Sequence, residues 1–275
     1  MNTESTVCVE VRNVYKIFGA QADRALELSR QGMGKKEVLA QTGCNVGLRD
    51  VSLHIPSGEI FCIMGLSGSG KSTLVRHFNR LIEPTSGEIL LQGQDVLRMD
   101  DEALRTLRRS AISMVFQSFG LLPHKTVIDN VCFGLVSRGE AKADAVVKAR
   151  QWIERVGLAG YDAKYPDELS GGMRQRVGLA RALAMESDIL LMDEAFSALD
   201  PLIRHDMQGL LMELQSSLRK TIIFITHDLD EALRIGAQIA ILRDGELSQV
   251  GTPTHILEHP ANDYVRRFVE KRQAA

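Results

Sequence analysis

The sequence predicts an α/β fold in which a mostly parallel sheet is interrupted by a helical insert. Three observations lead to this prediction. Short apolar, β-rich runs alternate with helix-prone segments in both the first and the last third of the chain. A glycine-rich loop, residues 65–73, lies directly between one such run and a helix-prone segment. The stretch 118–168 lacks strand-like runs and is mostly helix-prone.

Length and composition set the limits of this fold. With 275 residues, the chain can form one large α/β domain or two small ones. A net charge of −2 argues against binding to bulk nucleic acid. The sequence has no apolar stretch of the roughly 18 residues that a membrane span needs and no signal-like N-terminus, so a membrane role would come through a partner. The four cysteines form no C-x-x-C pair, and Cys62 is interpreted as a buried apolar residue of a reduced cytoplasmic protein.

The first element is an alternating run, residues 7–18, which predicts an edge-type strand that ends at Gly19. Its aromatic residues Phe18 and Tyr15 each offer a face on which a purine could stack. Taken alone, each is more commonly a core residue.

Residues 20–47 do not continue the strand pattern and are mostly helix-prone. A helix over 22–30 and a second one over 35–41 are separated by Gly32 and Gly34. Such a helix pair could read DNA, but the chain is not basic and the segment interrupts an otherwise continuous domain. A surface insertion is therefore the simpler interpretation.

The remaining elements follow from the same patterns. Strands are expected at 48–55, 59–64, 88–92, 111–116, 189–192, 221–226, 238–242 and 246–250. Helices are expected from 73 onward and at 101–109, 127–135, 141–156, 173–184, 202–218 and 229–235. Trp152 lies at helical spacing with Val156 and is expected in the core.

The glycine-rich loop is a complete G-x-x-x-x-G-K-[ST] motif, Gly65-Leu66-Ser67-Gly68-Ser69-Gly70-Lys71-Ser72-Thr73. Its glycines can take positive φ, so that successive N–H groups close on a polyphosphate at the N-terminus of the next helix. Lys71 would supply a charge for the β and γ phosphates, and the Ser72 hydroxyl would ligate Mg²⁺. An accidental Gly/Ser-rich turn is the alternative, and the flanking strand and helix argue against it.

A pair of carboxylates, Asp193 and Glu194, ends the apolar run 189–192. Because strand residues alternate faces, the two side chains can do different work. Asp193 can hold Mg²⁺ and Glu194 can polarise the water that attacks the γ phosphate. Two carboxylates that merely cap the next helix are the alternative.

A third motif, Leu169-Ser170-Gly171-Gly172-Met173-Arg174-Gln175-Arg176, places small residues at the start of a helix, where they make another anion site. One γ phosphate does not need two such anion-binding sites from the same subunit. We therefore expect this turn to face the nucleotide of a second copy.

Taken together, these motifs resemble an ABC-transporter nucleotide-binding subunit. Gln117 after its strand, Ser197-Ala198-Leu199-Asp200, and His227 after the run 221–226 complete the ordered set. Over about residues 7–270 the chain is most similar to the ATP-binding subunits of the quaternary-amine (glycine betaine/proline betaine/choline) uptake group. The resemblance to that group is carried by Gly-Met-Gly-Lys-Lys-Glu, Phe-Gln-Ser-Phe-Gly-Leu-Leu-Pro-His and Tyr-Pro-Asp-Glu-Leu-Ser-Gly-Gly.

The resemblance implies a P-loop ABC ATPase with a RecA-like core, an antiparallel β subdomain and a helical signature subdomain. It implies one such domain over 1–275. The expected parts are a core with the β subdomain over 7–117 and 187–255, a helical insertion over 20–47, a helical subdomain over 118–186 and a C-terminal helical tail over 256–275. Regulatory CBS repeats of longer members are not expected, and this favours a nutritional over an osmotic role.

The resemblance also assigns site residues, with ATP and Mg²⁺ as cofactors. It implies Glu194 as the general base, His227 as the residue that contacts the γ phosphate and orients that base, and Gln117 as a third catalytic residue. Phe18 corresponds to the adenine-stacking aromatic, with Tyr15 as the fallback. Nucleotide contacts are implied for Gly65, Ser67, Gly68, Gly70, Lys71, Ser72, Thr73, Ser170, Gly171, Gly172 and Asp200, and metal contacts for Ser72, Gln117 and Asp193.

The implied function is ATP hydrolysis that drives uptake of a quaternary amine or related compatible solute. The same engine could import histidine or another amino acid, or a soluble ATPase of this class could act on nucleic acid. The implied partners are a second copy in a head-to-tail ATP-sandwich dimer, two permease subunits that dock near residues 117–134, and, indirectly, an extracytoplasmic binding protein. The implied location is the cytoplasmic face of the membrane.

Overall fold

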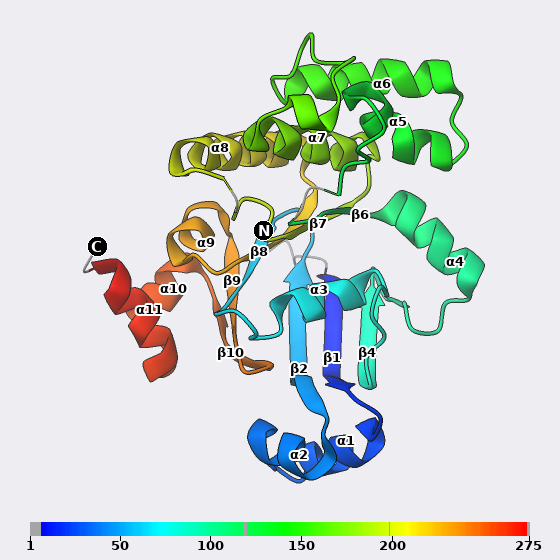
Figure 1. Ribbon diagram of the computed structural model, residues 1–275. Coiled ribbons are helices and arrows are strands. Elements are labelled where there is room, and N and C mark those ends of the chain that lie inside the picture. Colours follow the sequence, from blue (N-terminus) through cyan, green and yellow to red (C-terminus); the bar gives the residue numbers. More distant parts are fainter. Residues whose placement is uncertain (1–6, 118–119, 198, 274–275) are drawn as a thin grey trace, which may run out of the picture. The chain divides into compact units, whose positions relative to one another are not determined.

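The computed structural model describes residues 7–117, 120–197 and 199–273. The chain forms two compact units, one made of residues 1–104 and 225–275 and the other of residues 105–224. Figure 1 labels the elements in chain order.

The first unit contains a four-stranded antiparallel sheet with the order β2-β1-β4-β5. Its strands are β1 (Val7–Phe18), β2 (Asn45–Pro56), β4 (Ser86–Leu91) and β5 (Gln94–Asp95). β1 therefore has a neighbour on each side, and the expectation of an edge strand is wrong. That expectation rested on the alternation of apolar and polar residues, but the polar positions of β1 have partners on both sides: Glu10 contacts His54 on β2, and Arg12 pairs with Glu88 on β4.

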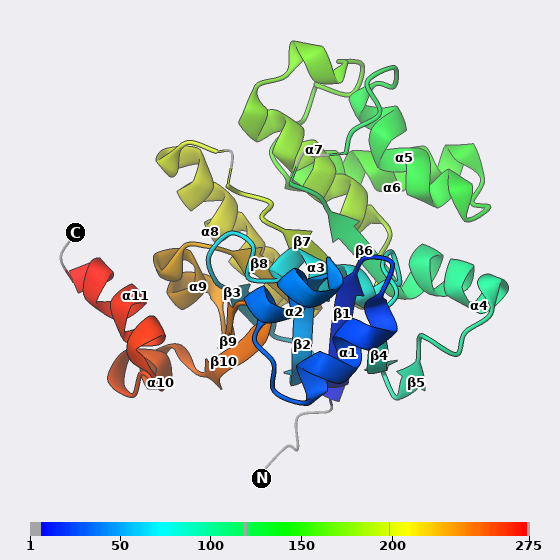
Figure 2. The ribbon, with the colours of Figure 1, turned by 60° about the horizontal axis from the view of Figure 1, so that its bottom comes forward.

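Two helices lie between β1 and β2, as the sequence predicts: α1 (Ala22–Arg30) and α2 (Lys35–Thr42). Figure 1 shows them at one end of β1 and β2, and Figure 2 shows them from that end. Their buried residues share a small core with the ends of both strands, made of Ile17, Ala25, Leu28, Val38, Cys44 and Val46. Burial of apolar surface stabilises by about 25 cal/mol for each Å². This apolar core therefore holds the insertion on the sheet.

The first unit also holds β3 (Ile60–Met64), which pairs in parallel with β9 (Gln238–Arg243), and β10 (Glu246–Gly251), which pairs antiparallel with β9. All five residues of β3 are buried, as expected of a strand in a parallel sheet. The helices of this part are α3 (Lys71–Phe78), α9 (Leu229–Ile235), α10 (Pro253–Glu258) and α11 (Asp263–Gln273). Cys62 on β3 is fully buried, as expected.

His77 on α3 is a buried titratable group of this unit. Its Nδ1 lies 2.5 Å from the carbonyl oxygen of Thr73, and its Nε2 has no partner among the described residues. Burial lowers the pKa of His77 to about 4 from 6.5. The unfolded chain therefore binds this proton more tightly than the folded chain, and stability is lost as the pH falls from 6.5 towards 4.

We expect the free energy of unfolding to fall by about 2 kcal/mol because of His77 when the pH is lowered from 7 to 5. Urea denaturation at both pH values should show a smaller loss in His77→Leu than in the wild type. Substitution of the exposed His124 by glutamine is the control and should leave the loss unchanged. An equal loss in the wild type and His77→Leu would contradict the prediction.

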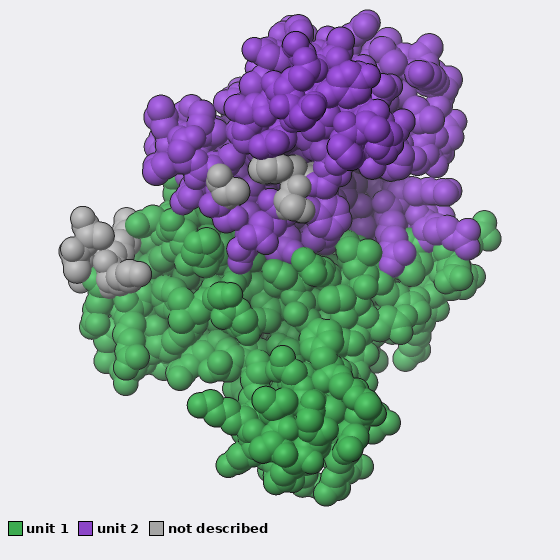
Figure 3. Space-filling view, in the orientation of Figure 1, with its two compact units in different colours: residues 1–104, 225–275 green, residues 105–224 purple. Residues whose placement is uncertain are grey.

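The second unit is the purple part of Figure 3. In it, β6 (Ile112–Val115) pairs in parallel with β7 (Ile189–Asp193), and β8 (Thr221–Thr226) leads out of the unit. The helix predicted over 101–109 ends early: α4 (Asp101–Thr106) passes into a π-helical turn, Leu107–Ala111, before β6. A single π turn of five residues is too short to leave a periodic pattern in the sequence.

The helical layer of this unit consists of α5 (Val127–Ser137), α6 (Lys142–Arg155) and α7 (Gly171–Ala184), which pack against one another. Trp152 lies in their shared core, as expected. The longest helix, α8 (Pro201–Leu218), follows β7. Among the described residues, no helix combines the length and the apolar character that crossing a membrane requires.

Candidate functional site

The glycine-rich loop connects β3 to α3 in the first unit. Gly65, Gly68 and Gly70 all have positive φ, as the motif requires. A Cβ on Gly65 would lie 2.3 Å from the carbonyl oxygen of Leu242, and one on Gly70 would lie 2.8 Å from that of Gly47. The loop therefore keeps its course only with glycine at these two positions.

Lys71 is only 4% exposed, and its Nζ donates hydrogen bonds to the carbonyl oxygens of Gly65 (2.9 Å) and Leu66 (3.2 Å). The ammonium group is thus held inside the loop. The Ser69 hydroxyl is buried and has no hydrogen-bond partner among the described residues. Ser67 and Gly68 are exposed, and Ser72 and Thr73 are half-buried in the first turn of α3. This set of donors fits a polyphosphate.

Phe18 and Tyr15 differ in exposure. The Phe18 ring is 42% exposed and lies beside Gly47, where a Cβ would come within 2.7 Å of the ring. Tyr15 is 8% exposed, with the Arg30 guanidinium 5.5 Å from its ring centroid. The Lys16 ammonium lies 5.0 Å from the Phe18 ring centroid, so each ring has a cation near it, and Phe18 is the more exposed of the two aromatics.

His227 is exposed in the turn between β8 and α9. The turn is held by Thr226, whose buried hydroxyl donates to the Glu231 carboxylate at 2.5 Å and accepts from the Asp228 N–H at 3.0 Å. Asp228 then caps α9 by accepting from the N–H groups of Asp230 and Glu231. This network sets the direction in which the backbone presents His227.

In the second unit, the parallel register pairs Val115 with Met192, so Gln117 and Glu194 both lie two residues beyond this pair. The Gln117 amide nitrogen donates to a Glu194 carboxylate oxygen at 3.4 Å, and Asp193 is buried at the end of β7. The sheet therefore brings together two of the expected catalytic residues.

Glu194 adopts an unusual backbone conformation, with φ of 46°. A non-glycine residue in the left-handed region costs about 1–2 kcal/mol. The turn is held by Ser197, whose N–H (3.1 Å) and hydroxyl (2.8 Å) both donate to the Glu194 carbonyl oxygen. Such strain occurs most often at functional sites.

The third motif forms the start of α7. The Ser170 hydroxyl caps the helix by accepting from the Met173 N–H, and the exposed Asp200 caps α8 by accepting from the Ile203 N–H. A Cβ on Gly172 would lie 2.7 Å from the Ile203 side chain, whereas one on Gly171 would meet nothing within 4 Å. Gly172 thus lets the N-termini of α7 and α8 approach each other, and Ser170 and Asp200 remain exposed.

Three contributions to these sites were not anticipated. The orphaned hydroxyl of Ser69 was passed over as part of a Gly/Ser-rich loop. Gly47 beside Phe18 was assigned to the end of the insertion, whereas the structure places it in β2. Gly245 lies between the strands expected at 238–242 and 246–250, where no role was expected of it, but its N–H donates to the Ser69 carbonyl oxygen at 3.0 Å, so the β9–β10 turn supports the glycine-rich loop.

A family comparison matches the part of the chain that carries most of these residues. A sequence profile described as ABC transporter matches residues 48–197, more than half of the chain. The chain belongs to the ABC transporter family. The resemblance drawn from its motifs is confirmed.

Relatives within the ABC transporter family are similar over almost the whole chain. The glycine betaine/proline betaine transport system ATP-binding protein ProV of Salmonella typhimurium is 58% identical over 94% of this chain. The chain spans 65% of the length of ProV. The trimethylamine N-oxide transport system ATP-binding protein TmoW of Pelagibacter ubique is 49% identical over 96% of this chain and 77% of its own length.

A solved structure supports the fold. A dimeric, post-hydrolysis ATP-binding cassette bound to ADP and Pi superposes with a TM-score of 0.75. It is 32% identical to this chain, and the match covers 89% of this chain and 98% of that one. The predicted fold, an α/β ABC ATPase with an antiparallel β part and a helical part, is confirmed.

Proposed function

We propose that the chain is the ATP-hydrolysing subunit of an ABC importer that takes up a quaternary amine or related compatible solute. The observation that carries the proposal is the glycine-rich loop in a chain of the ABC transporter family. Positions 65 and 70 of this loop accept only glycine, and the loop encloses the ammonium group of Lys71. The relatives ProV and TmoW, by their names, serve betaine and trimethylamine N-oxide transport.

ATP binds at this loop in our proposal. Lys71 exchanges the Gly65 and Leu66 carbonyl oxygens for the β and γ phosphates, and the loop N–H groups surround them. The buried Ser69 hydroxyl, which lacks a partner among the described residues, gains one. Phe18 stacks on the adenine, and Ser67, Gly68, Ser72 and Thr73 complete the phosphate contacts.

Mg²⁺ would be held by Ser72, Gln117 and Asp193, whose hydroxyl, amide and carboxylate oxygens suit this hard cation. When bound, the ion neutralises charge that develops on the phosphate oxygens. Gln117 and Glu194 already share a hydrogen bond at 3.4 Å. In the proposal, the Glu194 carboxylate accepts a proton from the attacking water, and His227 contacts the γ phosphate and orients that base.

The exposed caps of α7 and α8 suit a second copy of the chain. Ser170, Gly171 and Gly172 would complete the ATP site of the other subunit, and Asp200 would reach across the interface. The similar cassette described above is dimeric, which supports this arrangement. The proposed assembly adds two permease subunits at the cytoplasmic face of the membrane and a substrate-binding protein on the other side.

Two other functions were considered from the sequence. Import of histidine or another amino acid has less support, because ProV and TmoW are both named for methylated amines. A soluble ATPase acting on nucleic acid has less support still, since the chain carries a net charge of −2 and these relatives are transport proteins.

Uptake of labelled glycine betaine, choline, proline and histidine tests the proposal in cells deleted for this chain and complemented with the wild type or Lys71→Ala. We expect one methylated amine to enter only with the wild type. Loss of histidine uptake alone would favour the amino-acid alternative. If the deletion leaves uptake of all four compounds unchanged, the importer assignment is wrong. ATP hydrolysis by the purified protein is measured separately and tests the ATPase assignment.

A further inference from the structure

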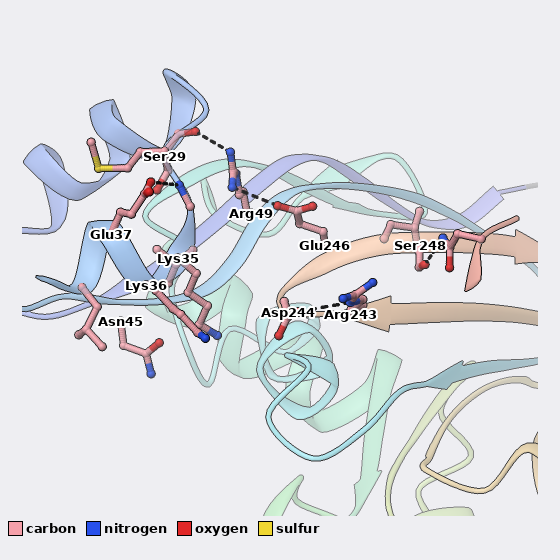
Figure 4. A pocket seen from close by; sticks show the side chains of 16 residues that line it. Ser29, Lys35, Lys36, Glu37, Asn45, Arg49, Arg243, Asp244, Glu246 and Ser248 are labelled. Atoms are coloured by element: carbon pink, nitrogen blue, oxygen red, sulfur yellow. Dashed lines mark hydrogen bonds and ion pairs between the residues drawn. The ribbon is translucent and has the colours of Figure 1, made fainter. Parts of the chain in front are cut away.

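A cavity of about 870 Å³ lies within the first unit, where the helical insertion faces the β9–β10 turn. Figure 4 shows its lining side chains, which come from the α1–α2 segment, the first part of β2, the β9–β10 hairpin and Asn262, just before α11. A volume of this size suits an organic ligand of several hundred daltons and far exceeds the space an inorganic ion needs.

The charges along the cavity are unevenly matched. Arg49 pairs with Glu246 at 3.2 Å and Arg243 pairs with Asp244 at 3.4 Å. The Glu37 carboxylate accepts from the Gly34 N–H at 3.2 Å. Lys35 and Lys36 have no ion pair or hydrogen bond to any described residue. The cavity therefore offers two unmatched positive charges.

The lysines stand together at one side of the cavity. Figure 4 shows their side chains running alongside each other from α2, with Asn45 on the same side and Arg243 and Asp244 across from them. Other parts of the wall are apolar and come from Met33, Leu39 and Leu247. A ligand that fits has an anionic group for the lysines and a flat or apolar part for this wall.

The cavity is connected to the glycine-rich loop through a single residue, Gly245. The Gly245 carbonyl oxygen accepts from the Arg49 N–H at 2.8 Å, and the Gly245 N–H donates to the Ser69 carbonyl oxygen at 3.0 Å. Arg49 and the neighbouring Asp244 both line the cavity. A ligand in the cavity would therefore contact residues of the β9–β10 turn, which supports the glycine-rich loop.

We propose that this cavity binds a nucleotide, with its phosphates on Lys35 and Lys36 and its base against the apolar wall. The proposal rests on the proposed function, in that a nucleotide is the ligand this chain would already handle. This nucleotide is a second one, because the nucleotide proposed for the glycine-rich loop has its phosphates at Lys71. Its binding would make the insertion a second nucleotide-binding part of the chain.

Calorimetric titration with ADP at low ionic strength tests this proposal. The test variants are the double variant K35A/K36A and Leu39→Glu, which puts a carboxylate on the cavity wall at a position that is 49% exposed and therefore tolerant of change. The control is R98A/K142A, which removes two exposed positive charges elsewhere. Circular dichroism should show that all variants are folded.

We expect the wild type and R98A/K142A to bind two ADP molecules, and K35A/K36A and Leu39→Glu to bind one, at the glycine-rich loop. Lys71→Ala retains one ADP, which is lost when K35A/K36A is added. The proposal is overturned if the wild type binds a single ADP, or if K35A/K36A binds as many ADP molecules as the wild type with the same Kd. Failure of the proposed function is a different result, in which Lys71→Ala leaves ATP hydrolysis intact.

Discussion

Gly65→Ala is expected to lose nucleotide binding by about 10–100-fold and to lower the free energy of unfolding by about 2–4 kcal/mol. The added Cβ would lie 2.3 Å from the Leu242 carbonyl oxygen and 2.6 Å from the Ser69 hydroxyl oxygen, at a backbone φ of 152°. Since Leu242 belongs to the buried strand β9, the loop has to move instead. Moving the loop misaligns the N–H groups that surround the phosphates.

Gly68→Ala is the matched control for this prediction. Gly68 also has positive φ, 78°, but a Cβ there would meet nothing within 4 Å. Its alanine variant keeps the N–H group and costs only the backbone strain of about 1–2 kcal/mol. Titration with ADP and urea denaturation of both variants check the prediction. Nucleotide affinity that is equal in Gly65→Ala and the wild type would show that the loop adapts and that the geometry has been misinterpreted.

Much of the fold could be predicted because its signals are local. The alternation in β1 and the helix pair of the insertion follow from hydrophobic periods of two and 3.6. The glycine-rich loop is recognisable because each of its residue types has a physical reason to be there. Cys62 and Trp152 were expected in the core and lie there.

What the sequence did not predict depends on residues far apart in the chain. β1 has two neighbours because β4 returns to pair with it, and no pattern within residues 7–18 reveals that partner. The hydrogen bond between Gly245 and Ser69 joins segments that are 176 residues apart in the chain. The cavity joins Lys35 of α2 to Asp244 of the β9–β10 turn, 209 residues away. The roles of Phe18, His227 and Asp200 stay predictions, since they concern ligands and partner subunits.

Glu194→Gln is expected to lower the kcat of ATP hydrolysis by about 10²–10⁴-fold while leaving the Kd for ATP nearly unchanged. The glutamine keeps the size of the side chain and can still lie near Gln117, which is 3.4 Å away in the wild type, but it cannot accept a proton from water. Single-turnover hydrolysis and equilibrium ATP binding measure the two effects separately.

Glu186→Gln is the matched control, because Glu186 is an exposed glutamate of the same unit that also has positive φ, 56° against 46° for Glu194. Both substitutions remove one negative charge from a left-handed turn, so only chemistry distinguishes them. Equal kcat values for the two variants would show that the Glu194 carboxylate is not the base. The left-handed backbone conformation of Glu194 costs about 1–2 kcal/mol and would suit a glycine better. A fall in kcat confined to Glu194→Gln would explain this strain by the catalytic role of the carboxylate.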